Sequence, residues 1–358
     1  MKRKSIAVGL VCLFAAGLWN CSNSPETGID DHRSLKESLS GETINLERAV
    51  GTISQSPGFE ILTNTGNTKS TTEDDRFTAS ITMDNLKGIY DYQINPDDSV
   101  NTITQQNRYF KKTDESDHFI IRLPKEKAAD HSYLFSYSEQ DTTLVNDFVI
   151  TTNDFLYHYS GGINFKYLLD TRIDIEDQFA GTLKINWDLN SLTNMDYSCS
   201  YGFEQDYAVG VNFHRGDTLS FQYLLTKEDE PLYREKYTLL PKGDSTTRDR
   251  EYSLLIGDIE IIRNSSSDTF QVYKGEVLQE NATVEIIAQT DQQEDNVAFC
   301  LKGRDMQITF DDGTTVLLST MMGDSLETLN TLFKSLADVY FATHLVNRMA
   351  FEIYYLNK

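Results

Sequence analysis

The feature that most constrains this chain is a period of two in its hydrophobic pattern, which recurs between about residues 76 and 320. Side chains of a strand point alternately to the two faces of a sheet, so this pattern is typical of strands with one buried face. Four segments show it clearly: residues 77–83, 207–213, 219–225 and 282–288. The alternation favours antiparallel sheets, and the lack of a strand–helix–strand rhythm argues against a doubly wound fold.

Turn-forming residues separate the expected strands at short intervals, as at Gly161-Gly162 and Asp311-Asp312-Gly313. We therefore expect a mainly β (α+β) fold. It is an antiparallel β meander that forms curved sheets or an open barrel, with a short N-terminal helix and a long C-terminal helix.

Helical spacing appears only near the two ends of this β region. Apolar residues at positions 46, 49, 50 and 53 predict a short helix that stops before Ser56-Pro57. Asp324 and Glu327 resemble a capping box at the start of a long helix, which we expect to end between residues 347 and 350. Alternating apolar residues at 351, 353 and 355 then predict a closing strand.

The chain is acidic, because 55 Asp and Glu residues oppose 32 Lys and Arg residues and give a formal net charge of −23. Binding to nucleic acid depends on neutralisation of phosphates by Lys and Arg, so this balance argues against a nucleic-acid partner. Hydrophobic residues make up 39% of the 358 residues, which is enough for a sizeable core.

The first 20 residues have the organisation of a signal peptide. Lys2-Arg3-Lys4 precedes an uncharged apolar run over residues 6–19, which is too short to span a membrane as a helix. The run ends in Leu18-Trp19-Asn20-Cys21, which resembles a bacterial lipobox. That resemblance implies a lipid (palmitate-bearing) on Cys21 and attachment to the outer membrane, facing either the periplasm or the cell surface. Cleavage after Gly17 without lipidation is the alternative.

Domain boundaries follow from this start. Removal of residues 1–20 takes away three positive charges and no acidic ones, which changes the formal charge to −26. Residues 21–41 are polar and are interpreted as a tether. We expect the N-terminal helix and a first β region over residues 42–160, and a second β region with the C-terminal helix over residues 161–358. One continuous domain is the alternative.

The search for catalytic residues is negative. The chain contains no H-E-x-x-H, G-x-S-x-G, G-x-x-x-x-G-K-[ST] or C-x-x-C motif, and its six His residues are scattered. We therefore expect no enzyme activity, no cofactor and no metal. The acidic run at residues 228–230 is interpreted as a solvated turn, and the many Tyr residues at alternating positions as core. Cys199 and Cys300 form either a disulfide or two buried thiols.

Five tripeptides of the form D-[ST]-[AILVMT] resemble the O-glycosylation acceptor motif of exported Bacteroidetes proteins. Asp-Ser and Asp-Thr are also ordinary turn and cap residues, which is the alternative interpretation. The five candidate acceptors are Ser99, Thr142, Thr218, Ser245 and Ser325.

Three further segments carry a resemblance to a known group of proteins: residues 81–92 (ITMDNLKGIYDY), 258–263 (DIEIIR) and 308–317 (ITFDDGTTVL). Together with the lipobox-like start they resemble an uncharacterised Bacteroidales (Bacteroidetes) lipoprotein family. The resemblance implies an envelope location, no known activity and no catalytic residue.

Three hypotheses about function follow. The first is a lipid-anchored envelope protein that acts as a non-enzymatic binding or structural module, with a protein, glycan or lipid ligand. The second is a carrier of hydrophobic ligands with a curved sheet similar to that of LolA-like periplasmic carriers. The third is a hydrolase that uses two carboxylates.

Overall fold

The structure is a computed structural model that describes residues 33–63, 78–93, 109–129, 144–241, 248–264, 267, 269–288, 304–337 and 341–356. The chain divides into two units, Met1–Arg33 and Ser34–Lys358. The fold described below is that of the second unit. The predicted signal peptide, the lipidation site Cys21 and most of the predicted tether lie outside the described residues.

Strands predominate, which confirms the expected mainly β class: they hold 52% of the described residues, and helices hold 28%. The helices are α1 (Leu35–Ser54), α2 (Pro57–Thr63), α3 (Lys125–Ala129), α4 (Leu318–Met322), α5 (Asp324–Ala337) and α6 (Phe341–Leu356), with 3-10 turns η1 (Met83–Asn85) and η4 (Glu204–Asp206). The first nine strands are β1 (Ala79–Thr82), β2 (Gly88–Tyr92), β3 (Phe110–Asp114), β4 (Phe119–Leu123), β5 (Phe148–Tyr159), β6 (Phe165–Ile175), β7 (Gln178–Ser191), β8 (Asn194–Gly202) and β9 (Tyr207–Arg215). The other nine are β10 (Leu219–Lys227), β11 (Glu230–Pro241), β12 (Arg248–Ile256), β13 (Ile259–Arg263), β14 (Gln271–Lys274), β15 (Val277–Leu278), β16 (Thr283–Ala288), β17 (Arg304–Thr309) and β18 (Thr315–Leu317).

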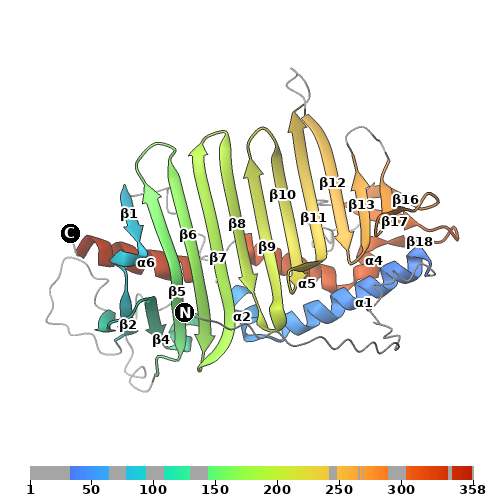
Figure 1. Ribbon diagram of the computed structural model, residues 1–358. Coiled ribbons are helices and arrows are strands. Elements are labelled where there is room, and N and C mark those ends of the chain that lie inside the picture. The colour runs from blue at the N-terminus through green and yellow to red at the C-terminus, as the bar shows by residue number, and fades with distance from the viewer. Residues whose placement is uncertain are drawn as a thin grey trace, which may run out of the picture. The chain divides into compact units, whose positions relative to one another are not determined.

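One large open sheet dominates the unit (Figure 1). From β15 back to β4 its strands lie in reverse chain order, followed by β2 and β3, and β1 pairs with β5. Among the described strands only β2 and β4 pair in parallel. Strands β16, β17 and β18 form a second, three-stranded sheet. Strands β5 and β6 pair on either side of Gly161-Gly162, so the large sheet continues across the boundary expected between residues 160 and 161.

Acidic residues form two of the tight hairpin turns. Glu176 and Asp177 connect β6 to β7, and Glu228 and Asp229 connect β10 to β11. All four residues have φ between 50° and 68°, the left-handed conformation that a two-residue turn requires to match the twist of its strands. The solvated turn predicted at residues 228–230 is therefore present.

Helices α1, α2, α5 and α6 lie on one face of the large sheet, crossing the middle and one end of the strands (Figure 1). Helix α5 contacts β8 and β9, α2 contacts β7, and α1 contacts α5 and β12. Gly58 in α2 shows how close this packing is, because an added Cβ would lie 2.2 Å from the Ala180 carbonyl oxygen. The buried core lies between these helices and the sheet.

Helix α1 begins earlier than the sequence pattern predicted, so the prediction of a tether is wrong for residues 35–41. Ser34 and Glu37 form a capping box that starts the helix. The buried face includes Leu35, Leu39 and Leu46, but also Ser38 and Thr43. These buried polar residues interrupt the apolar pattern, so the sequence pattern does not predict the first two turns of α1.

The C-terminal part also differs from the prediction. It contains two helices, α5 and α6, with residues 338–340 outside the described part of the chain. The predicted closing strand at residues 351–355 is wrong, because these residues belong to α6. Leu345, Val346, Met349 and Ile353 are all buried, and this helical spacing extends over more residues than the short alternation that suggested a strand.

No helix among the described residues is both long and apolar enough to cross a membrane.

Candidate functional site

A row of eight aromatic residues crosses the large sheet on the face that carries the helices. Each residue lies directly opposite the next on the neighbouring strand, from β5 to β12. We call this the aromatic row: Tyr157, Tyr167, Trp187, Tyr197, Phe213, Phe221, Tyr237 and Tyr252. Directly opposed side chains are the closest neighbours in a sheet, so the register places eight aromatic rings in one line.

The two ends of the aromatic row are covered. Tyr157, which is 7% exposed, packs edge-to-face against Phe351 of α6 with ring centroids 4.7 Å apart. At the other end Tyr252, also 7% exposed, packs against Phe270 with ring centroids 6.3 Å apart. Here the prediction that the tyrosines are core residues is correct.

The middle of the row is partly exposed. We call its five residues the open aromatic surface: Trp187, Tyr197, Phe213, Phe221 and Tyr237. Two pairs of these rings are in contact, with centroids 5.9 Å apart for Trp187 and Tyr197 and 4.6 Å apart for Phe213 and Phe221. The prediction of a core position is wrong for Tyr237, whereas Tyr197 is partly buried and packs against the core. The reason is that α5 does not cross the row itself: its Phe333 packs on Tyr223, which is two residues along β10 from Phe221 of the row.

Helix α5 defines one border of this surface. Its Phe333 ring lies 5.2 Å from the ring of Tyr223 and 6.0 Å from that of Tyr233, between centroids. Both tyrosines lie on the side of the aromatic row that faces away from the β9–β10 turn, toward the helices. In Figure 1 the hairpin ends of β8 to β12 extend beyond α5 at the top of the sheet. The open aromatic surface is therefore the part of this face that α5 leaves uncovered.

The other border is the next row of opposed residues, toward the ends of the strands where β7 connects to β8 and β9 connects to β10. We call it the border row: Leu189, Met195, Arg215, Leu219, Leu239 and Arg250. The four apolar members are partly exposed, and both arginines are exposed. The apolar surface therefore extends over two rows and ends in positive charge.

A buried carboxylate lies under the aromatic row. Glu235 of β11 has no exposed surface, and it accepts hydrogen bonds from the Tyr252 hydroxyl at 2.9 Å and the Tyr233 hydroxyl at 3.3 Å. A second buried acid, Asp305, accepts hydrogen bonds from the backbone N–H and the hydroxyl of Ser319 and so caps α4. Neither carboxylate faces solvent, so neither is placed to act on a substrate.

Cys199 also lies under the aromatic row, between Ile185 and Val211 on the neighbouring strands. Burial raises the pKa of its thiol to about 12, although a contact with Tyr197 lowers the pKa in part. The thiol is therefore protonated at neutral pH and unreactive as a nucleophile. Cys199 is a free buried cysteine, whereas Cys300 lies outside the described residues.

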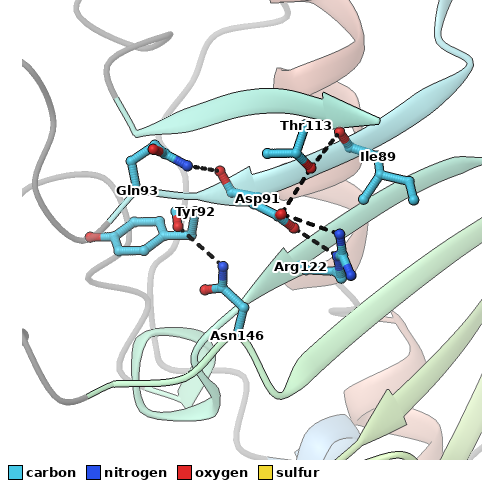
Figure 2. A network of polar contacts seen from close by, with 7 residues as sticks. All are labelled: Ile89, Asp91, Tyr92, Gln93, Thr113, Arg122 and Asn146. Carbon is cyan, nitrogen blue, oxygen red and sulfur yellow. Dashed lines mark hydrogen bonds and ion pairs between the residues drawn. The ribbon is translucent and has the colours of Figure 1, made fainter. Parts of the chain in front are cut away.

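A separate polar network lies at the β2–β4 end of the sheet (Figure 2). The Arg122 guanidinium donates to both carboxylate oxygens of Asp91, at 2.7 and 3.2 Å, and the Thr113 hydroxyl donates to the same carboxylate at 2.8 Å. Asn146 donates to the Tyr92 carbonyl at 3.1 Å. Every oxygen of Asp91 is thus occupied by a neighbouring strand, so this network joins β2, β3 and β4 rather than forming a reactive site.

The structure describes two of the five predicted O-glycosylation acceptors, and neither is a residue of the open aromatic surface. Thr218 lies partly exposed in the β9–β10 turn, while Ser325 in α5 is only 5% exposed. The acceptors Ser99, Thr142 and Ser245 are outside the described residues. Within the described part of the chain no group of His, Cys, Asp and Glu is arranged to hold a metal ion.

Sequence reasoning missed the aromatic row, although it left a signal in the sequence. Phe213 and Phe221 lie symmetrically about the β9–β10 turn, so this pair follows from the position of the turn, because a tight hairpin pairs residues that are equally far from it. The pairing of Trp187 with Tyr197 does not follow in this way, because the β7–β8 register shifts by one residue between Leu189 and Ser191.

Comparison with protein-family models, with curated proteins and with solved structures gives no match. The fold and the surface therefore define the class of protein: an open, mainly antiparallel sheet with helices on one face and an aromatic row whose middle is partly exposed beside α5.

Proposed function

We propose that this protein is a non-enzymatic binding module of the cell envelope that holds an apolar or amphipathic small molecule on the open aromatic surface. The observation that carries the proposal is the line of five partly exposed aromatic residues on the helix-bearing face of the sheet. Contiguous exposed apolar surfaces on soluble folds are typical of binding sites. The proposal unites the first two hypotheses from the sequence and favours an apolar ligand.

The composition of the surface supports an apolar ligand over a glycan. The open aromatic surface and the apolar members of the border row present rings and aliphatic groups, while the Trp187 indole N–H is buried and the Tyr197 hydroxyl contacts the buried Cys199 thiol. Sugars require many directed hydrogen bonds, whereas an aliphatic chain requires only contact area. The hydrolase hypothesis has no support from the two buried acids, because Glu235 and Asp305 are both enclosed.

The binding experiment uses the neutral fluorescent probe N-phenyl-1-naphthylamine and the purified protein. We expect fluorescence to increase on binding, and we expect the double variant Phe213→Ala/Phe221→Ala to bind about tenfold to a hundredfold more weakly. Removal of two phenyl rings from a contact surface removes about 1.5–3 kcal/mol of favourable burial. Fluorescence titration measures both dissociation constants.

The matched control is Leu224→Ala/Leu240→Ala, which removes apolar side chains from the opposite face of β10 and β11. This variant should bind the probe as the unchanged protein does. If the protein gives no fluorescence increase, or if both double variants lose affinity equally, the open aromatic surface is not the binding site.

The envelope location is proposed from the signal sequence and rests on lipidation of Cys21. Substitution Cys21→Ser removes the sulfur that would carry the lipid, so we expect the protein to move from the membrane fraction to the soluble fraction of cells that process lipoproteins. Cys12→Ser, a change inside the apolar run, is the control and should leave the distribution unchanged. Retention of Cys21→Ser in the membrane fraction would exclude the lipid anchor.

A further inference from the structure

Three arginines lie at the β12–β13 end of the open aromatic surface, and a fourth lies beside its middle. Arg250 and Arg248 lie on β12 and Arg263 on β13, all on the helix-bearing face, and Arg215 lies farther along the border row on β9. All four side chains are exposed. Arg263 lies opposite Tyr252, the last residue of the aromatic row, and its guanidinium is 5.7 Å from the centre of the Phe270 ring.

Among the described residues, the two rows that contain Arg215, Arg250 and Arg263 hold no carboxylates. The opposed residues of the aromatic row and the border row from β5 to β13 include no Asp or Glu. None of the four arginines is ion-paired with a carboxylate among the described residues. In a chain of net charge −23, a cluster of cations in rows where the structure describes no acidic residue is a local reversal of sign and attracts an anion.

Arg250 and Arg263 are the two members placed to act together. They lie on adjacent strands, and Arg263 opposes Tyr252, which is two residues from Arg250. The two arginines are therefore diagonal neighbours on one face, with Cα atoms about 7–8 Å apart. Two guanidinium groups at this separation can converge on one carboxylate or phosphate, which is the geometry for which arginine is best suited.

The open aromatic surface leads away from this pair in a straight line. It runs from Tyr237 on β11 to Trp187 on β7, which is four strand spacings of about 4.8 Å, or about 19 Å in all. That length matches an extended long acyl chain. The surface therefore offers an apolar track with a cationic group at one end.

We infer that the ligand is a monomeric long-chain amphiphile with an anionic headgroup. Its tail lies along the open aromatic surface, and its headgroup is bound by Arg250 and Arg263. The inference rests on the proposed function, because it adds the headgroup and the direction of the ligand to the proposed apolar site. The charge at the end of the track is what distinguishes a fatty-acid-like molecule from an uncharged lipid.

The experiment compares cis-parinaric acid, a fluorescent fatty acid, with its uncharged methyl ester. We expect the acid to bind at least tenfold more tightly than the ester, and its affinity to fall as salt concentration rises. The double variant Arg250→Gln/Arg263→Gln should bind acid and ester equally, with the ester affinity within twofold of that of the unchanged protein. Both substitutions are at exposed positions, and thermal unfolding checks that the variant is folded.

The control variant Lys184→Gln/Lys236→Gln removes the same two charges from exposed positions on the opposite face of the sheet. It should keep the preference for the acid. If it loses that preference as fully as the arginine variant, the preference reflects net charge and the headgroup site is excluded. If Arg215→Gln alone abolishes the preference, the headgroup lies on β9 and the inferred direction is wrong.

Two further outcomes separate the inference from the proposed function. Equal binding of acid and ester to the unchanged protein, with both lost in Phe213→Ala/Phe221→Ala, overturns the headgroup site and leaves the apolar site intact. Failure of acid, ester and N-phenyl-1-naphthylamine to bind overturns both. Binding to phosphatidylglycerol vesicles through the arginines, without binding of monomeric acid, overturns the inference and assigns the arginines to a membrane surface.

Discussion

Substitution Glu235→Ala is expected to lower the free energy of unfolding by about 3–5 kcal/mol, the largest effect of any single substitution proposed for this protein. The side chain is fully buried, and its two oxygens accept from the Tyr252 and Tyr233 hydroxyls at 2.9 and 3.3 Å. The substitution removes the acceptor of each hydroxyl and leaves a cavity the size of four heavy atoms on the helix-bearing side of β11. Urea unfolding followed by circular dichroism measures the change.

Glu251→Ala is the matched control for this prediction. Glu251 is one residue from Tyr252 on β12 but faces the other side of the sheet and is partly exposed, so its removal should change stability by less than about 0.5 kcal/mol. A double-mutant cycle with Tyr252→Phe should give a coupling free energy of about 1–2 kcal/mol with Glu235→Ala. Equal unfolding midpoints for Glu235→Ala and Glu251→Ala would show that the buried carboxylate does not stabilise the sheet.

The second large effect is a dependence of stability on pH through Glu352 of α6. The side chain is 8% exposed, and burial raises its pKa from 4.5 to about 7, while the neighbouring Arg348, at 3.4 Å, opposes the rise in part. Because the folded pKa is above the unfolded one, the folded state binds the proton more tightly. The stabilising contribution of the protonated form is therefore complete below pH 4.5 and is lost as the pH rises through about 7.

The substitution Glu352→Gln tests this directly, because glutamine resembles the protonated acid and does not titrate. At pH 8 the variant should be more stable than the unchanged protein by about 3 kcal/mol, and at pH 5 the difference should be much smaller. Glu327→Gln, at an exposed position in α5, is the control and should give a small difference that is the same at both pH values. If Glu352→Gln behaves like this control, Glu352 is ionised in the folded protein at neutral pH.

Ionisation of Glu352 would also change how α6 covers the β5 end of the aromatic row. Helix α6 carries Phe351, next to Glu352, and the Phe351 ring covers Tyr157 at the β5 end of the row. Loosening of α6 above pH 7 would expose Tyr157 and lengthen the apolar surface, while leaving the five residues of the open aromatic surface where they are.

The sequence was most informative where a pattern is local. Alternation at residues 207–213 and 219–225 predicted β9 and β10, because side-chain direction in a strand depends only on position along it. The acidic turn at residues 228–230 was predictable for a similar reason, since a turn is made within a few residues. Local patterns failed where polar residues are buried, as at Thr43 in α1, or where a short alternation lies inside a longer helical stripe, as at residues 351–355.

The sequence by itself thus determined the mainly β class, the antiparallel pairing of neighbouring strands and which residues share a face. The tertiary structure alone decided that aromatic residues on eight successive strands stand in one line, that α5 stops short of their middle, and that Arg250 and Arg263 meet at one end. The physical reason is that a period of two assigns a face, whereas alignment across strands depends on the registers of seven successive pairings, and exposure depends on where a helix distant in sequence packs.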